Sequence, residues 1–141
     1  MTKAGRFERC QRIRFSDCDP AGIVFYPQYF VMLNGLVEDW VTDALGIPYA
    51  ELLGPRRIGM PTVSLQTEFR AISRMGDEVT FGLGVEHLGS RSLILALDGR
   101  CGGEERVRTR QVIVTTSLDT HQAVALPPDL RAAIERFCRQ E

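Results

Sequence analysis

Hydrophobic residues recur at helical spacing in one long segment of the chain. Between Pro27 and Leu45 they fall at positions 30, 33, 36, 37, 40, 41 and 44, which form one face of a helix. Pro27 is typical of a first helical turn, and Gly46 is typical of the position just after a helix end. We therefore predict a helix over residues 27–45. Residues 127–139 form a second amphipathic segment, which predicts a helix near the C-terminus.

Alternation of apolar and polar residues predicts strands in the rest of the chain. In residues 7–15, Ile13 and Phe15 alternate with arginines, which indicates a strand before the long helix. Four antiparallel strands are predicted after that helix, separated by Met75-Gly76-Asp77, by Leu88 to Arg91 and by the hairpin pair Gly102-Gly103. These strands cover residues 61–72, 79–85, 93–97 and 107–118.

This order of elements predicts an α+β fold in which one five-stranded antiparallel sheet wraps around a single long helix, with a C-terminal helix. Arg106, Arg108 and Arg110 share one side of the last strand, so that side is either solvated or meets something anionic. A sheet this small leaves edges and one face that need cover. Dimerisation provides that cover, either by making two sheets continuous or by packing two faces.

Composition limits the classes of function. The 141 residues predict one domain over residues 1–141, and 44% hydrophobic with 25% charged residues is ordinary for a globular protein. The net charge of -1 gives no reason to expect nucleic acid or membrane as a partner. Residues 1–15 are charged and lack the apolar core of a signal peptide, and the run 21–37 is too short and polar to span a bilayer. We expect a cytoplasmic protein.

Cysteine and histidine usage argues against metal and thiol chemistry. The four cysteines are scattered, with no C-x-x-C pair, and neither histidine belongs to a triad motif. Cys18 is flanked by two aspartates, which raise rather than lower the pKa of a thiol. We therefore expect no metal or redox cofactor, and catalysis must fall to carboxylates or to the backbone.

The segment from Asp17 to Tyr29, DCDPAGIVFYPQY, concentrates the candidate chemistry. Two carboxylates precede a helix start, where amide N–H groups and the helix dipole favour negative charge on an acceptor. Pro27 has no N–H, so Tyr26 is the last donor before it. Gly22 lets the backbone adopt conformations barred to other residues. Either aspartate can instead cap the following turn, and capping is the better account of Asp17.

The same segment resembles the hot-dog-fold acyl-CoA thioesterases, in particular the 4-hydroxybenzoyl-CoA thioesterase type with its D-x-D-P-A-G-I-V-x-Y-P-x-Y pattern. The resemblance implies that Asp19 attacks the thioester carbonyl or activates water to do so, and that the Tyr26 backbone N–H polarises the thioester oxygen. It also implies that residues of the motif and of the strand predicted over residues 61–72 contact the substrate, and that surface arginines bind the phosphates of coenzyme A. These further candidates are Gly22, Phe25, Tyr29, Thr62, Ser64, Arg74 and Arg91.

The chain departs from relatives with broader specificity, which carry His at the position of Pro27 and an acidic residue followed by Ala-Arg further along the helix. Here that second region reads Asn34-Gly35-Leu36-Val37, which favours the aromatic-acyl subgroup. The resemblance thus implies a homodimer or homotetramer that hydrolyses a small aromatic acyl-CoA to free acid and CoA. Two alternatives stay open: a non-catalytic acyl-CoA-binding or sensing module, and a hot-dog acyl-thioester dehydratase.

Overall fold

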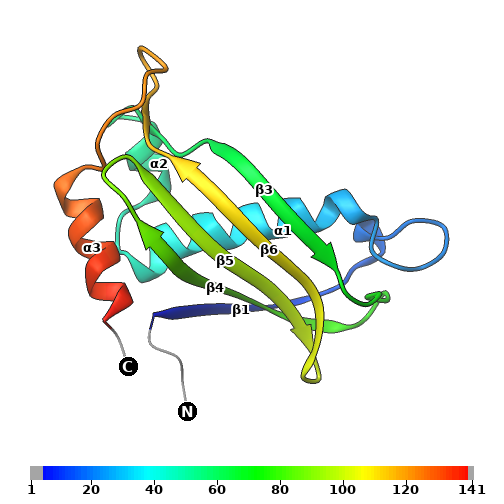
Figure 1. Cartoon of the computed structure of the whole chain (residues 1–141). Coiled ribbons are helices and arrows are strands. Elements are labelled where there is room, and N and C mark those ends of the chain that lie inside the picture. The colour runs from blue at the N-terminus through cyan, green and yellow to red at the C-terminus, as the bar shows by residue number, and fades with distance from the viewer. Residues whose placement is uncertain (1–4, 140–141) are drawn as a thin grey trace.

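A long helix lies along the concave face of one antiparallel sheet (Figure 1). The computed structural model describes residues 5–139. The sheet has the strand order β1-β4-β5-β6-β3 and is antiparallel throughout. Its strands are β1 (Arg6–Arg12), β3 (Thr62–Phe69), β4 (Glu78–Leu88), β5 (Ser92–Cys101) and β6 (Glu104–Val114). The helices that pack on it are α1 (Tyr26–Asp39) and α3 (Pro128–Cys138). The predicted fold class is confirmed.

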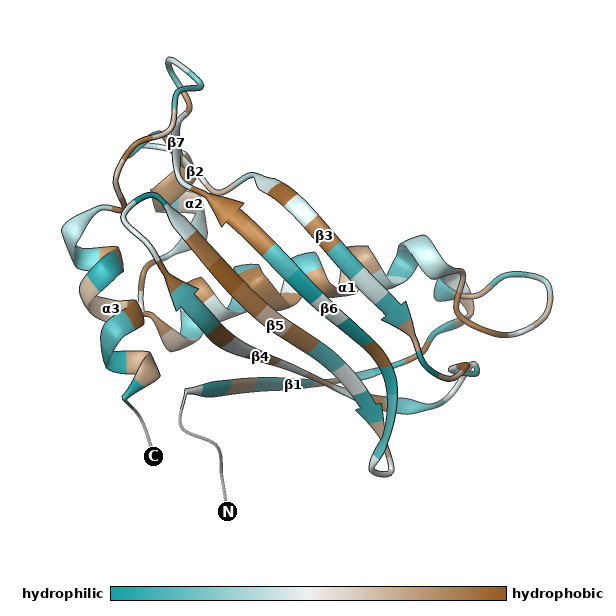
Figure 2. Cartoon of the chain, viewed as in Figure 1, coloured by the Kyte–Doolittle hydropathy of each residue, from teal (hydrophilic) through white to brown (hydrophobic). Residues whose placement is uncertain are grey.

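The core lies between α1 and the inward faces of the central strands. Helix α1 buries Leu33, Leu36 and Val37, which are 3–5% exposed. Opposite it, buried residues alternate with more exposed ones along much of β5 and β6 and at the start of β4, and they include Phe81 and Leu95. Helix α3 closes one end of this core with its own apolar face, as the hydropathy colouring of Figure 2 also indicates.

The helix predicted over residues 27–45 extends to residue 44, but its last turn is π-helical instead of α-helical. After α1, residues Trp40–Ala44 form a π-helical turn (η2), in which the Leu45 N–H donates to Trp40 O over 2.9 Å. The Trp40 side chain is fully buried, with its ring 5.5 Å from that of Phe137 on α3. Gly46 follows with φ +74°, which fits its predicted place after the helix end.

Several strand limits were wrong, and β4 and β5 extend beyond the predicted residues 79–85 and 93–97. The first strand ends at Arg12, and Phe15 is 81% exposed in a short 3-10 turn, η1 (Phe15–Asp17), because the chain turns there into the acidic loop. The strand predicted over residues 61–72 ends at Phe69. The last strand ends at Val114 because Thr115 donates its hydroxyl to Val124 O and leaves the ladder.

Three small elements were missed. They are α2 (Tyr49–Leu53), β2 (Ile58–Gly59) and β7 (Thr116–Ser117), of which the two strands form a separate antiparallel ribbon. All are too short to show a hydrophobic period in the sequence. By contrast, the predicted hairpin at Gly102-Gly103 is confirmed, since both glycines have positive φ (+58° and +84°), as a two-residue hairpin turn requires.

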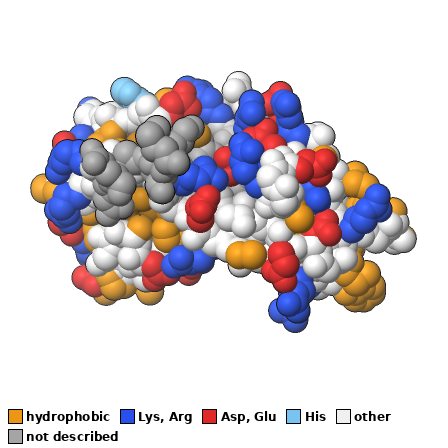
Figure 3. All heavy atoms as spheres, turned by 90° about the horizontal axis from the view of Figure 1, so that it is seen from below, with side chains coloured by type: hydrophobic (Ala, Val, Ile, Leu, Met, Phe, Trp, Pro, Cys, Tyr) orange, Lys and Arg blue, Asp and Glu red, His pale blue; other side chains and the backbone are white. Residues whose placement is uncertain are grey.

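Charged side chains cover the outward face of the sheet. Arg108 and Arg110 point away from the core, and Arg108 pairs with Glu105 over 2.8 Å. Figure 3 shows acidic and basic side chains interspersed on one view of the surface, with no large region of a single sign among the described residues. Within residues 5–139, no helix is long and apolar enough to cross a membrane.

The two edge strands differ in character. Strand β1 is short and presents four charged side chains among its seven residues. Seven of the eight residues of β3 are exposed, and they include Val63 (60%), Leu65 (42%) and Phe69 (50%). Charged edges discourage pairing with another chain, whereas an apolar edge invites it. Strand β3 is therefore the edge suited to a partner.

Candidate active site

The acidic motif folds into a tight loop that leads directly into α1. The Asp19 N–H donates to Ile23 O (3.0 Å), and the Phe25 N–H donates to Asp17 O (2.9 Å). These two bonds bring the two arms of the loop together. Gly22 sits at its tip with φ +77°, a conformation that suits glycine, and its N–H donates to Asp19 O. The loop therefore holds Asp19 and the start of α1 at the same end of the molecule.

The two aspartates have different partners. The Asp17 carboxylate accepts the Arg14 N–H over 2.8 Å, so it caps the 3-10 turn. Asp19 accepts the Ala21 N–H with one oxygen over 2.9 Å, and no donor among the described residues contacts its other oxygen. Cys18 lies between the two aspartates in the sequence; burial raises the pKa of its thiol, and both aspartates raise it further. Asp19 is thus the carboxylate with an oxygen available for chemistry.

The start of α1 carries a free hydrogen-bond donor. The first N–H groups of a helix have no acceptor within the helix. Here Pro27 has no N–H, and the Gln28 N–H donates to Phe25 O over 2.8 Å. No side chain caps the helix, and no acceptor for the Tyr26 N–H is found within residues 5–139. This amide is available to polarise a carbonyl oxygen at the positive end of the helix dipole.

Aromatic side chains surround that donor. The rings of Phe25 and Tyr26 are 5.7 Å apart, and both are about half exposed. Phe69, at the end of β3, packs against Tyr26 (5.9 Å), Tyr29 (6.0 Å) and Phe30 (6.2 Å). Tyr29 itself is only 4% exposed, and its hydroxyl donates to Ser73 Oγ over 2.8 Å. Of the predicted aromatic contacts, Phe25 is therefore accessible to a ligand, whereas Tyr29 lies beneath the surface.

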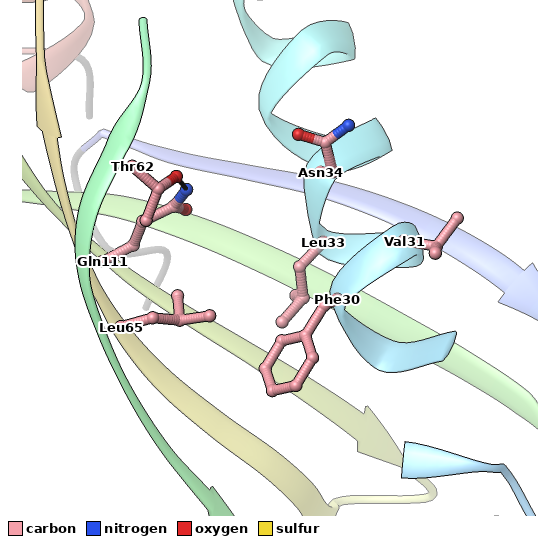
Figure 4. A pocket seen from close by; sticks show the side chains of 7 residues that line it. All are labelled: Phe30, Val31, Leu33, Asn34, Thr62, Leu65 and Gln111. Carbon is pink, nitrogen blue, oxygen red and sulfur yellow. Dashed lines mark hydrogen bonds between the residues drawn. The ribbon is translucent and has the colours of Figure 1, made fainter. Parts of the chain in front are cut away.

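A cavity of about 390 Å³ opens between α1 and β3 (Figure 4). Its walls are mostly apolar, and three polar side chains gather at one end: Asn34, Thr62 and Gln111. Gln111 donates to Thr62 Oγ1 over 2.7 Å. Its other lining residues are Phe30, Val31, Leu33 and Leu65. An apolar cavity with a few polar groups suits a small organic ligand.

Gln111 was missed as a site residue by sequence reasoning, although the strand pattern contains a signal. It occupies an inward position of β6 between buried Thr109 and Ile113, where a large polar side chain needs a partner. Thr62 and Ser64 do not share a face: a bulge between them leaves Thr62 in the cavity, whereas Ser64 pairs with outward-facing Val112. The structure therefore does not bring Ser64 to the cavity.

The two predicted phosphate-binding arginines lie at opposite ends of the sheet. Arg74 is next to the acidic loop, where it forms a backbone bridge with Ile23. Arg91 lies in the turn between β4 and β5. Strand β4, which separates these two ends, has 11 residues, and such a strand is about 33 Å long. Within one chain, Arg91 is thus remote from Asp19. Among residues 5–139 there is no group of three or more His, Cys, Asp or Glu side chains able to hold a metal ion.

The sheet wrapped around α1, with an acidic loop at the helix start, defines a hot-dog-fold protein of the thioesterase class. Residues 13–134 match the family model of the thioesterase-like superfamily, and the chain belongs to that family. The prediction of a hot-dog thioesterase is confirmed at the level of the family.

Individual relatives support this placement. The chain is 35% identical over 71 residues to 4-hydroxybenzoyl-CoA thioesterase of Pseudomonas sp. (strain CBS-3), a match that spans half of each protein. It is 26% identical over 132 residues to 1,4-dihydroxy-2-naphthoyl-CoA hydrolase of Prochlorococcus marinus (strain MIT 9303), covering 87% and 85% of the two chains. The structure of a gentisyl-coenzyme A thioesterase superposes with a TM-score of 0.82 at 27% identity, over 91% of this chain and 99% of that one.

Proposed function

We propose that this protein hydrolyses the CoA thioester of a small hydroxylated aromatic acid to the free acid and CoA. The relatives named above act, by their names, on hydroxybenzoyl, dihydroxynaphthoyl and gentisyl thioesters. The observation that carries the proposal is that, within residues 5–139, one Asp19 oxygen and the Tyr26 N–H have no hydrogen-bond partner, and that the two residues lie on the acidic loop and at the helix start that follows it. A carboxylate and a fixed N–H donor are the two groups that acyl transfer from a thioester requires.

Two routes use these groups. In one, Asp19 attacks the carbonyl carbon, the C–S bond breaks, and the CoA thiolate leaves and takes up a proton. Water then hydrolyses the resulting mixed anhydride to the acid and Asp19. In the other, Asp19 accepts a proton from a water molecule that attacks the carbonyl directly. In both, the Tyr26 N–H stabilises the negative charge that develops on the thioester oxygen, a contribution of about 3 kcal/mol for one well-placed donor.

We further propose that the working unit is a homodimer that pairs through β3. Among the described residues, no strand pairs with the exposed apolar edge of β3, and antiparallel addition of a second β3 makes the two sheets continuous. Such pairing places the Thr62 end of one copy beside the Phe69 end of the other. Arg91 of the partner subunit then comes toward Asp19. A dimer of this kind can therefore bring Arg91 and Asp19 into one site, although they lie at opposite ends of a single chain. A tetramer built from two such dimers stays a prediction.

The cavity beside β3 is the proposed site for the acyl group. Its apolar walls fit an aromatic ring, and the polar end offers donors and acceptors to a ring hydroxyl. A site that hydrogen-bonds a substrate hydroxyl discriminates strongly against analogues without it, because its own polar groups are then left unpaired. We therefore expect hydroxylated aryl esters to be preferred over benzoyl and aliphatic esters.

A thiol-release assay over a panel of CoA esters tests the function. The panel contains 4-hydroxybenzoyl, gentisyl, benzoyl, acetyl and hexanoyl thioesters. The proposal predicts turnover with the highest kcat/KM on a hydroxylated aryl ester. Binding of these esters without thiol release identifies a sensing module instead, and preference for an aliphatic ester overturns the assigned acyl class. The cytoplasmic location and the absence of a metal or redox cofactor stay predictions.

A further inference from the structure

Ser73 is buried between the two segments that carry the proposed catalytic groups. It follows β3 and is 1% exposed. Its carbonyl oxygen accepts the Val24 N–H of the acidic loop over 2.9 Å. Its hydroxyl oxygen accepts the Tyr29 hydroxyl of α1 over 2.8 Å. A single residue is therefore bonded both to the loop that contains Asp19 and to the first turn of the helix that begins with Tyr26.

The neighbours of Ser73 strengthen its link to the acidic loop. Arg74 forms an antiparallel bridge with Ile23, and the Met75 N–H donates to Gly22 O over 3.2 Å. The Asp19 N–H donates to Ile23 O, so Asp19 is bonded to the loop residue that pairs with Arg74. A shift of residues 73–75 is consequently passed to Asp19 through three successive loop residues.

Arg106 fixes Ser73 to the sheet. Its Nη1 contacts three acceptors: Ile72 O (2.9 Å), Ser73 Oγ (3.2 Å) and Asp77 Oδ2 (2.8 Å). The Arg106 side chain is only 12% exposed, and its strand, β6, is paired on both sides. A planar guanidinium with several acceptors has little freedom to move. The position of Ser73 is thus set by the sheet rather than by the loop.

We propose that Ser73, held by Arg106 and bonded to Tyr29, is a positioning residue that sets the separation between the Asp19 carboxylate and the Tyr26 N–H. The inference rests on the proposed function, because it assigns catalytic roles to those two groups. Ser73 and Tyr29 are buried and act through their neighbours. The distance between a reacting carboxylate and an oxyanion donor matters because misplacement by about 1 Å can cost as much as a hundredfold in rate.

Three variants test the proposal: Tyr29→Phe, Ser73→Ala and the double variant. Tyr29→Phe removes the hydroxyl but keeps the ring that packs against Phe69 and Phe81. Each single variant is expected to lower kcat by about tenfold or more with KM nearly unchanged. Because the two residues act as one unit, the double variant is expected to lose no more activity than either single variant.

Ile134→Val is the matched control. It removes one buried methyl group from α3, at the end of the molecule opposite the acidic loop in Figure 1. Ile134→Val is expected to reduce thermal stability about as much as Tyr29→Phe or Ser73→Ala does, while leaving kcat unchanged. Equal kcat values in Ile134→Val and the two single variants overturn the positioning role. A rise in KM at constant kcat also overturns it, since that result indicates a substrate contact.

Hydrogen exchange gives a readout that does not depend on catalysis. Peptides covering residues 17–30 are expected to exchange faster in Tyr29→Phe and Ser73→Ala than in the wild type or in Ile134→Val. Unchanged exchange in this segment overturns the inference even if the protein is a thioesterase. Absence of thiol release by the wild type overturns the proposed function, whereas the exchange result still decides whether Ser73 links the loop to the helix.

Discussion

Replacement of each aspartate of the acidic loop by asparagine separates catalysis from folding. Asp19→Asn keeps a side-chain oxygen that can accept the Ala21 N–H, which in the wild type donates to Asp19 Oδ1 over 2.9 Å. Asn at position 17 likewise keeps an acceptor for the Arg14 N–H, now at 2.8 Å. Both variants therefore preserve the loop's hydrogen bonds and remove one negative charge each. The two substitutions form a matched pair that differs only in which carboxylate is lost.

The expected magnitudes differ widely between the two positions. Loss of a catalytic carboxylate typically lowers the rate by about 10²–10⁴-fold, equivalent to roughly 3–5 kcal/mol of transition-state stabilisation. We expect Asp19→Asn to fall in this range. We expect Asp17→Asn to retain activity within about threefold, because only a surface charge changes. Asp19→Ala additionally loses the hydrogen bond to the Ala21 N–H, which at a partly exposed site contributes about 0.5 kcal/mol, or a shift of roughly 2 °C in melting temperature.

The assay is thiol release under saturating substrate, combined with thermal melting of each variant. Asp19→Asn is expected to melt with the wild type and to be nearly inactive. If Asp17→Asn is inactive and Asp19→Asn is not, the roles of the two carboxylates are reversed. If both retain activity, neither carboxylate carries the reaction, and the mechanism proposed above is refuted.

Three further predictions concern stability and assembly. The Arg74 backbone N–H, followed by Arg106, lowers the pKa of Asp77. A lowered folded-state pKa stabilises the fold at pH values above the unfolded pKa of about 4, so Asp77→Asn should destabilise the protein at pH 7. In acid melts the difference should start to shrink near pH 4 and vanish once the pH is below the lowered folded-state pKa. A Cβ at Gly99 would lie 2.9 Å from the Phe81 ring, so Gly99→Ala should cost about 1–3 kcal/mol in denaturant unfolding, and an unchanged midpoint would contradict this packing. Val63→Glu places a charge on the exposed edge of β3. We expect this variant to sediment as a monomer and to release thiol more slowly than the wild type. An unchanged dimer would argue against pairing through this strand.

Periodic patterns in the sequence were sufficient for the fold but not for its short elements. Helix α1 and the four long strands follow from residues that repeat at spacings of 3.6 or 2, because burial on one face requires those spacings. At the π-helical turn, by contrast, the Trp40 ring packs against Phe137 of α3, which lies 97 residues further along the chain. Such contacts leave no local signature.

The candidate site divides in the same way. Asp19 and Tyr26 lie seven residues apart on one loop, so a local motif is enough to place them. Gln111 and Arg106 reach the site through the pairing of β6 with β3, and nothing in the sequence near the motif indicates them. Ser73 lies between a strand and a turn, where the sequence shows no periodicity. The candidates Asp19 and Tyr26 could therefore be named from the sequence alone, and their catalytic roles stay predictions, whereas the residues that contact their loop and helix required the structure.

The free groups of the site also bear on how it binds a ligand. An uncapped helix start costs about 1 kcal/mol relative to one with a good capping residue. Within the described part of the chain, helix α1 has no side-chain cap, and its first turn has no acidic residue, although two aspartates precede it in the acidic loop. Asp17 caps another turn, and Asp19 bonds to Ala21 instead of to the helix. Because neither carboxylate accepts the Tyr26 N–H, this donor stays open to the carbonyl oxygen of a thioester.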